Sequence, residues 1–303
     1  MPSFTFASTA NAFALRGATL RFVDIRPDTL NIDETRIEPV ITKNTKVIVP
    51  VHYAGVGCQM DVIGAIARER DLLVIEDAAQ GVNSTFNGRY LGTIGHLGCY
   101  SFHETKNFIC GEGGALLIND PRFVERAEII REKGTNRAKF FRGEVDKYTW
   151  VDIGSSYLPS ELSAAFLYAQ LEQADEITKR RLAIHKRYTL GLRPLVDAGH
   201  LRAQTSTDES HNAHMFFILV ESAAVRARLL AELKQNQIHA VFHYVPLHTS
   251  PMGRRYGYKP GDLPVTEDLS ERLIRLPCYY ELSEHDQDRI IAAIHDFYRP
   301  PRA

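Results

Sequence analysis

Acidic residues and a lysine follow apolar runs that read as β-strands. Glu76 and Asp77 come directly after the run 72–75, and Lys106 comes shortly after the run 97–102. In open α/β sheets, ligands bind beyond the carboxyl ends of the strands. These side chains are therefore the first candidates for chemistry.

An amine and a carboxylate at such an edge indicate one kind of cofactor. A lysine held beside a buried site can lose its charge and act as a nucleophile, and the glycines of 111–114 let the backbone pass close to a ligand. Pyridoxal 5'-phosphate (PLP) needs a lysine for its aldehyde and a carboxylate for its pyridine nitrogen. Both residues also have ordinary interpretations, because an acid here can cap a helix and a loop lysine is usually solvated.

Other cofactor and metal sites lack their signatures. The phosphate loop G-x-x-x-x-G-K-[ST] is absent, and no G-x-G-x-x-G follows a strand. The four cysteines contain no C-x-x-C pair, which disfavours a zinc site and a disulfide framework. His243 and His248 have no accompanying carboxylate, so we predict no metal.

Composition limits the possible partners. The 303 residues carry a net charge of −1 and are 44% hydrophobic, which fits a globular protein of two domains and argues against a protein whose main work is to hold nucleic acid or a membrane surface. The basic run 179–181 is expected on a solvated helix face. The cysteines are scattered, and the sequence shows neither a signal peptide nor a transmembrane run. We therefore expect a cytoplasmic protein.

Hydrophobic periodicity predicts an α/β fold. We expect a mostly parallel sheet flanked by helices in residues 1–175, and a smaller α+β domain in 176–303 that includes the connecting helix. The predicted strands are 47–51, 72–75, 97–102, 115–118, 215–220 and 238–244. The predicted helices are one capped by Asp61, one from Pro121 to about Lys133, 159–195 with Ser160 as cap, 223–235, and 283–298 with a cap at its start.

At these positions the sequence resembles the DegT-type nucleotide-sugar aminotransferases, PLP enzymes with the aspartate-aminotransferase-like fold (fold type I). The likeness runs from end to end. Its most specific pieces are 2–6 with Ser8-Thr9, 76–80, 101–107, 111–114 and 242–248. A related dehydratase branch has histidine in place of the lysine, so Lys106 favours amination.

The resemblance implies a role for each motif residue. Lys106 would bind the cofactor aldehyde as a Schiff base and later act as the base. Asp77 would pair with the pyridinium, and Gln80 would reach the ring hydroxyl. Ser101 would contact the phosphate, and Phe6 would lie against the ring. Further residues are implied near the cofactor or the sugar: His103, Asn136, Tyr148, Ser156, His243, Tyr244 and His248.

The runs 133–137, 146–150 and 152–157 look most like one branch of the family. That branch uses glutamate to convert dTDP-4-keto-6-deoxy-D-glucose into dTDP-4-amino-4,6-dideoxy-D-galactose for enterobacterial common antigen. A homodimer is also implied, because the family builds its active site between subunits. Many relatives have asparagine where this chain has Ser156 and arginine where it has Leu158, which leaves the Ser156 hydroxyl to donate to phosphate.

Relatives carry a segment before the strand 2–6 whose Thr/Ser-rich helix start binds the cofactor phosphate. Without such a segment we expect weaker PLP retention. A second hypothesis is therefore a truncated, catalytically inactive remnant that only binds or dimerises. A third, a PLP-dependent regulator, is disfavoured because no DNA-binding motif is present.

Overall fold

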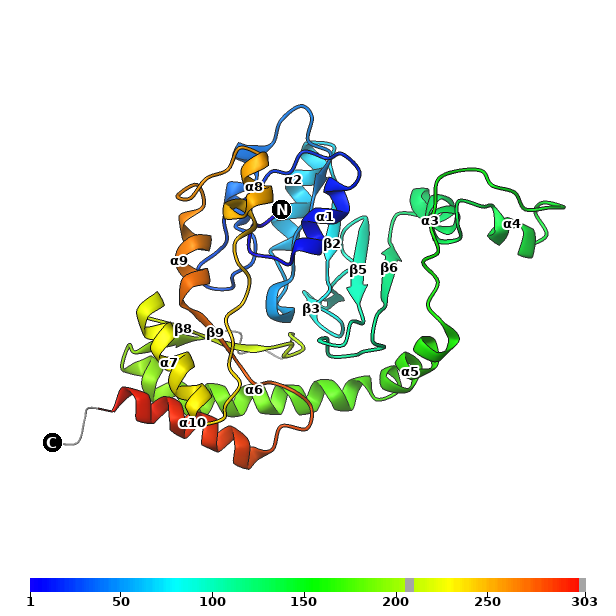
Figure 1. Ribbon diagram of the computed structural model, residues 1–303. Helices are drawn as coiled ribbons and strands as arrows, with labels where there is room; N and C mark the ends of the chain where they lie inside the picture. The colour runs from blue at the N-terminus through cyan, green and yellow to red at the C-terminus, as the bar shows by residue number, and fades with distance from the viewer. Residues whose placement is uncertain (205–209, 300–303) are drawn as a thin grey trace.

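The computed structural model describes residues 1–204 and 210–299 (Figure 1). Its larger sheet has the strand order β1-β2-β5-β6. These strands are Val47–Ile48, Leu73–Asp77, Leu97–Ser101 and Gly114–Ile118. Strands β1, β2 and β5 are parallel, and β6 returns antiparallel to β5. The α/β prediction is confirmed, with β6 making the sheet mixed.

The antiparallel return has a direct consequence for Lys106. Ser101 at the end of β5 pairs with Gly114 at the start of β6. The loop between them is therefore a hairpin connection that leaves the sheet and re-enters it at the same edge. The backbone N–H of Phe102 donates to the carbonyl of Gly113, and that of Glu104 donates to the carbonyl of Gly111. These bonds hold the lysine loop at the carboxyl end of the parallel strands.

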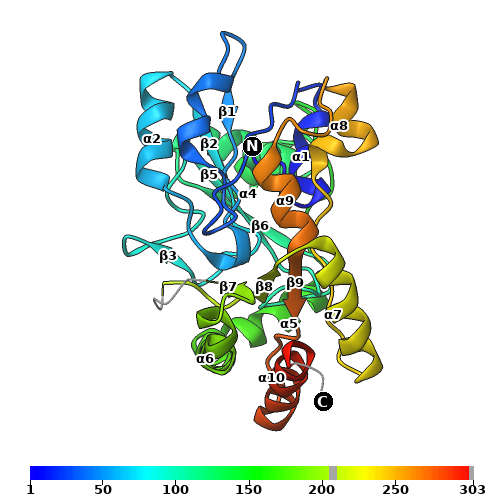
Figure 2. The same cartoon turned by 90° about the vertical axis from the view of Figure 1, so that its left-hand side faces the viewer.

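Two helices cover the faces of this sheet. In Figure 2 the strands lie between α2 (Met60–Glu69) and α1 (Ala7–Ala14). Ile63, Ile66 and Ala67 of α2 are buried against the sheet. The predicted cap at Asp61 is wrong: Asp61 is the second residue of α2, and its carboxylate accepts from the N–H of Val62. A two-residue Asn-Gly turn joins the short strands β3 (Thr85–Phe86) and β4 (Arg89–Tyr90).

The smaller sheet is antiparallel, with the order β7-β8-β9. It consists of Leu201–Ala203, Phe216–Val220 and Leu273–Leu276. Its helices are α6 (Ala174–Asp197), α7 (Ala223–Gln235) and α10 (Glu284–Tyr298), with α6 and α10 side by side in both views (Figures 1 and 2). Helix α7 has the predicted bounds, and α10 begins after the predicted Ser283 cap.

Two expectations for this part of the chain are wrong, and one strand was missed. Residues 238–244 form no strand, and only Val241 makes a bridge, to Arg275. Strand β9 was not predicted. The basic run 179–181 is not wholly solvated, because Arg181 is buried and donates to the carbonyls of Ala213 and His214.

An arm of short helices projects from the larger sheet (Figure 1). It contains α3 (Val124–Arg131) and α4 (Arg137–Phe141), and it leads into α5 (Glu161–Leu171). Pro121 opens a 3-10 turn before α3 rather than the helix itself. The predicted helix 159–195 is interrupted between α5 and α6, although Ser160 caps α5 as expected.

The chain returns to the larger sheet after α7. Helix α8 (Pro251–Arg255) lies near α1 in Figure 1, and α9 (Pro264–Arg272) leads from there down to the smaller sheet. One apolar cluster joins Phe4 and Tyr53 to Phe217 and Leu269, so early and late parts of the sequence share a core. The predicted boundary at residue 175 falls at the first turn of α6. It remains a prediction.

Candidate active site

Asp77 ends β2 and is held through its backbone and its carboxylate. Its N–H donates to the carbonyl of Pro50 at 2.9 Å, and its carbonyl accepts from the N–H of His52 at 3.1 Å. The hydroxyl of Thr9, on α1, donates to Oδ2 at 2.5 Å, and the N–H of Ala79 donates to Oδ1 at 3.1 Å. The carboxylate is fixed in place and keeps lone pairs for a further donor.

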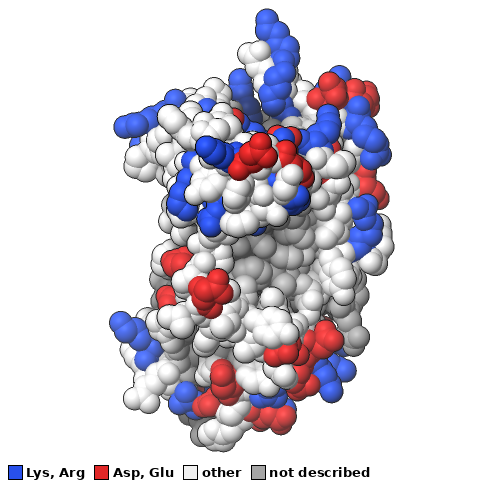
Figure 3. All heavy atoms as spheres, turned by 90° about the vertical axis from the view of Figure 1, so that its right-hand side faces the viewer, with Lys and Arg blue, Asp and Glu red and all other residues white. Residues whose placement is uncertain are grey.

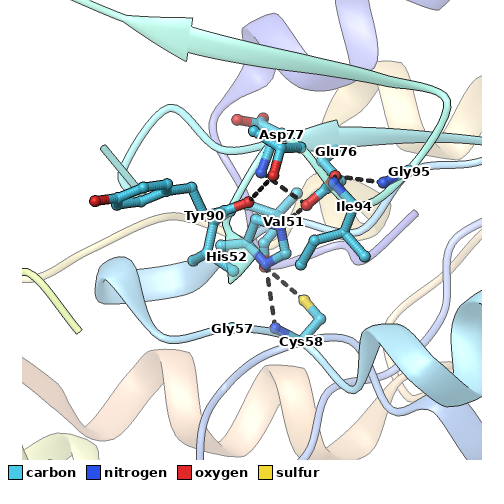
Figure 4. Close-up of polar contacts among 12 residues, drawn as sticks. Val51, His52, Gly57, Cys58, Glu76, Asp77, Tyr90, Ile94 and Gly95 are labelled. Carbon is cyan, nitrogen blue, oxygen red and sulfur yellow. Dashed lines mark hydrogen bonds and ion pairs between the residues drawn. The ribbon is translucent and has the colours of Figure 1, made fainter. Parts of the chain in front are cut away.

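The neighbouring Glu76 faces the other side of the strand, because successive strand residues point to opposite faces. It is fully buried (Figure 4). Its carboxylate accepts from Nε2 of His52 at 2.9 Å and from the N–H groups of Gly92, Ile94 and Gly95 at 2.8, 2.6 and 2.6 Å. Glu76 is therefore fully hydrogen-bonded within the protein, and Asp77 is the acid that remains available to a ligand.

The tautomer of His52 follows from its partners. Nδ1 accepts from the backbone N–H of Cys58 at 3.1 Å, so the ring hydrogen is on Nε2 and is donated to Glu76. Burial alone raises the pKa of Glu76, but the hydrogen bonds from His52 and the backbone outweigh it and lower that pKa overall. Glu76 is thus an ionised carboxylate with four donors.

Lys106 lies in the loop between β5 and β6, with its own N–H donating to the carbonyl of His103. Burial lowers the pKa of its amine, the carboxylate of Asp77 opposes this shift, and the guanidinium of Arg275 adds to it. A lysine with a lowered pKa is neutral more often and is a better nucleophile. The role that the sequence predicts for this residue remains a prediction.

Aromatic and amide side chains form a wall beside these two residues. Gln80 accepts from the N–H of Ala54 at 2.7 Å and donates to the hydroxyl of Tyr244 at 2.9 Å. His243 stacks on Tyr244 with ring centroids 3.6 Å apart and shares a 2.7 Å hydrogen bond with the hydroxyl of Tyr53. Burial, then Arg275 and Lys106, lower the pKa of His243 to about 2, so its ring is neutral.

Other predicted residues near the cofactor differ in accessibility. Ser101 lies at the end of β5, where its hydroxyl accepts from the N–H of His103 at 3.4 Å. The Phe6 side chain is 61% exposed and lies 6.4 Å from the Tyr244 ring. His103 is partly exposed, and its Nδ1 is 3.0 Å from the hydroxyl of Thr105.

His248 lies in a closed environment. Its ring is fully buried, with Nδ1 2.7 Å from the hydroxyl of Ser3 and Nε2 2.9 Å from the carboxylate of Glu267. Both ring nitrogens have protein partners, so no ring nitrogen is left for a sugar hydroxyl.

Three predicted residues lie on the arm, apart from Lys106 within the chain (Figure 1). Asn136 accepts from the N–H of Thr149, Tyr148 is about half exposed, and Ser156 pairs with Glu132. They can contribute to a site only if it belongs to another copy of the chain.

The sequence did not assign Thr9, Tyr53 or Arg275 to the site. Ser8-Thr9 was part of the resemblance but carried no role, although a hydroxyl in the first turn of α1 was visible. Arg275 had no signal, because its strand was not predicted.

Comparison with known proteins decides what this arrangement is. Residues 1–295 match the sequence profile of the DegT/DnrJ/EryC1/StrS aminotransferase family. The chain belongs to that family. The spore coat polysaccharide biosynthesis protein SpsC of Bacillus subtilis is 33% identical, over 97% of this chain and 77% of that protein.

Solved structures agree. A family aminotransferase from Brucella abortus has a TM-score of 0.88 at 32% identity, covering 99% of this chain and 79% of its own. The sugar aminotransferase Spr1654 of Streptococcus pneumoniae, described as putative, has been solved in its PMP form (TM-score 0.88, 26% identity, 98% of this chain and 80% of that one) and in a PLP form. The family is PLP-dependent, so the protein is a PLP-dependent aminotransferase of fold type I.

The residues present fit PLP. A buried amine that is readily neutral, a fixed carboxylate with a free lone pair and an aromatic wall are what its aldehyde, pyridine nitrogen and ring require. Among residues 1–204 and 210–299, no group of three or more His, Cys, Asp or Glu could hold a metal ion. Within the same ranges, no helix is long and apolar enough to cross a membrane.

Proposed function

We propose that this DegT-family aminotransferase moves an amino group from L-glutamate to a keto carbon of a nucleotide-linked sugar. The observation that carries the proposal is the pairing of Lys106, an amine with a lowered pKa, with the fixed carboxylate of Asp77 at one edge of the sheet. The names of Spr1654 and of SpsC, a sugar aminotransferase and a polysaccharide biosynthesis protein, support a sugar acceptor.

When bound, PLP supplies an electron sink and carries the amino group between the two substrates. Asp77 would stabilise positive charge at the pyridine nitrogen, with Thr9 and Ala79 holding its carboxylate. Gln80 would hold the ring hydroxyl, and Ser101 would hold the phosphate. The Nζ of Lys106 takes a proton from the α-carbon of the donor and returns one to the sugar carbon.

The acceptor we propose is dTDP-4-keto-6-deoxy-D-glucose, giving dTDP-4-amino-4,6-dideoxy-D-galactose for enterobacterial common antigen or another surface polysaccharide. This rests on the likeness of 133–137, 146–150 and 152–157 to that branch of the family. His243 and Tyr244 would approach the sugar. The four cysteines are free, which supports a cytoplasmic location.

We propose that the active unit is a homodimer. Asn136, Tyr148 and Ser156 lie on the arm, where the partner's site can use them. Figure 3 shows this side of the molecule, with charged side chains over its upper part and along its rim. Large apolar side chains are exposed here, among them Leu162 at 85% and Trp150 at 75%. An exposed apolar surface of this kind favours association.

The test uses the visible absorbance of the purified chain after PLP is added. We expect a cofactor band that bleaches with glutamate and is absent in Lys106→Ala. Lys186→Ala, a change on α6, is the matched control and should behave as wild type. After bleaching, dTDP-4-keto-6-deoxy-D-glucose should restore the band.

Two results would count against the proposal. A band that glutamate leaves unchanged would favour the non-catalytic alternative. If glutamate bleaches the band and keto acids restore it but no keto sugar does, the protein is an aminotransferase, and the proposed sugar acceptor is wrong.

A further inference from the structure

The residue that follows Lys106 ties the lysine loop to the chain beside the smaller sheet. The side-chain amide of Asn107 donates to the carbonyl of Asn212 at 3.1 Å, and its Oδ1 lies 2.9 Å from Nδ1 of His214. Both ends of one amide are thus bonded to the same short segment, 212–214, which leads into β8. The position of that segment fixes Asn107 and, with it, the backbone beside Lys106.

The segment 212–214 is itself held from α6. The buried guanidinium of Arg181 donates from Nε to the carbonyl of Ala213 at 3.0 Å and from Nη2 to the carbonyl of His214 at 2.6 Å. Ala213 has a φ of 49°, a left-handed conformation that is unfavourable for a residue with a Cβ atom. Such a conformation persists only where its surroundings fix it, and it is found preferentially at functional sites.

The same segment also holds the loop that follows Asp77. The side-chain amide of Asn212 donates to the carbonyls of Gln80 and Val82 at 2.8 and 2.7 Å. The segment 212–214 therefore contacts the chain after β2 and the chain after β5. It sets the place of the lysine loop relative to the loop that carries the acid.

The hydrogen-bond roles within this network follow from the groups present. The carbonyl of Asn212 can only accept, so the NH2 group of Asn107 faces it and Oδ1 faces His214. Because Oδ1 can only accept, the hydrogen is on Nδ1 of the His214 ring. Burial, then the charges of Lys106 and Arg181, lower the pKa of His214 well below its ordinary value. The ring is neutral and adds no positive charge near the amine.

We propose that His214 is a positioning residue that holds the Lys106 loop in place through its hydrogen bond to Asn107. The inference rests on the proposed function, in which Lys106 is the reactive amine. His214 acts through Asn107 on where the lysine lies, and it exchanges no proton with a substrate.

Loss of this bond has a consequence that can be measured at Lys106. Burial is the main cause of the lowered pKa of the lysine amine. A loop released from the segment 212–214 can move toward water, which hydrates the ammonium form and returns the pKa toward its ordinary value. A lysine that is protonated more often and held less firmly is also a poorer nucleophile and base.

The experiment measures the pKa of Lys106 in the full chain without PLP. The pH dependence of labelling by trace acetic anhydride is followed by mass spectrometry of the peptide that contains Lys106. His214→Leu should raise this pKa by about 1. His214→Asn, whose amide can donate from near the place of Nδ1, should stay close to wild type. After PLP is added, glutamate should bleach the His214→Leu band about 10-fold more slowly than the wild-type band.

A control variant separates position from general stability. His295→Leu removes another hydrogen-bonded histidine, which lies on α10 and donates to the carbonyl of Gly191 at 2.8 Å. It should leave the pKa of Lys106 and the bleaching rate unchanged. Asn107→Ala removes the acceptor of the proposed bond and should repeat the effects of His214→Leu, which covers the case that leucine prevents folding.

The outcomes separate the inference from the proposed function. If glutamate bleaches wild type but Lys106 titrates normally in folded His214→Leu, the inference is wrong and the proposed function stands. Equal shifts in His214→Asn or in His295→Leu would also overturn the inference, because the bond to Asn107 would not be their cause. A raised pKa with an unchanged bleaching rate would show that this position does not matter to the reaction. If glutamate does not bleach wild type, the proposed function and the inference are both wrong.

Discussion

Glu76 and Asp77 are adjacent in sequence and yet have opposite environments, because a strand turns them to opposite faces. The sequence indicated that acids end this strand but could not say which one a ligand meets. That depends on the loop 92–95 and on His52, which come from other parts of the chain and surround Glu76. Lys106 was easier to predict, since its position after a strand and before glycines is local information.

Glu76→Gln should destabilise the protein by about 3 kcal/mol at pH 7, because an amide cannot replace a buried ion with four donors. The folded-state pKa of Glu76 is lowered, so its stabilisation is full above the unfolded pKa and is lost as pH falls through the folded value. Urea unfolding should therefore show a smaller difference between variant and wild type near pH 4. Glu271→Gln, at an exposed position of α9, is the control. An equal difference at both pH values would contradict the assignment.

Asp77→Asn removes the charge and keeps one acceptor oxygen, which can still accept from the N–H of Ala79, while its amide NH2 replaces the oxygen that accepts from Thr9. We expect the PLP band to persist, because Lys106 is intact, and bleaching by glutamate to slow by about 100-fold, which is typical for loss of one electrostatic partner. Stopped-flow absorbance measures this rate. Asp197→Asn, at an exposed position of α6, is the control and should bleach at the wild-type rate. Unchanged bleaching in Asp77→Asn would remove this residue from the site.

At the scale of elements, helices with strong periodicity or a serine cap were predictable, and the edge of the smaller sheet was not. Residues 238–244 alternate like a strand, but only Val241 bridges to the sheet, and Tyr244 has a φ of 32°, which is not an extended conformation. His243 and Tyr244 stack on each other, which neighbours in a strand cannot do. Strand β9 lies between α9 and the turn before α10, and its short run gave no separate signal.

The cap of α10 can be tested alone. The Ser283 hydroxyl accepts from the N–H of Asp286 at 3.0 Å, which satisfies one donor of the first turn. Ser283→Ala should lower the free energy of unfolding by about 1 kcal/mol in urea denaturation. The same hydroxyl donates to the carboxylate of Asp286 at 2.7 Å, and Ser283→Thr keeps both bonds and should remain near wild type. A loss in Ser283→Thr as large as in Ser283→Ala would contradict the assignment of the cap.

At the scale of the molecule, the arm presents the apolar surface that we assign to a second copy. Leu162→Glu should weaken dimerisation by about 10-fold or more, because it places a charge in a desolvated contact. Sedimentation equilibrium measures the dissociation constant. Leu190→Glu is the matched control, since Leu190 is also exposed but lies on α6 away from the arm. If both variants associate as wild type does, this face is not the interface.

The bond between Thr9 and Asp77 joins α1 to the carboxylate that we assign to the cofactor ring. Thr9 also shares a 2.9 Å hydrogen bond with Thr5, so the first turn of α1 and the segment before it are tied to the same carboxylate. A change in charge at Asp77 therefore changes the strength of the Thr9–Asp77 hydrogen bond and the stability of the first turn of α1. Amide hydrogen–deuterium exchange in residues 7–14 should therefore slow when PLP is added, and α1 would act as a built-in reporter of cofactor occupancy that needs neither colour nor turnover.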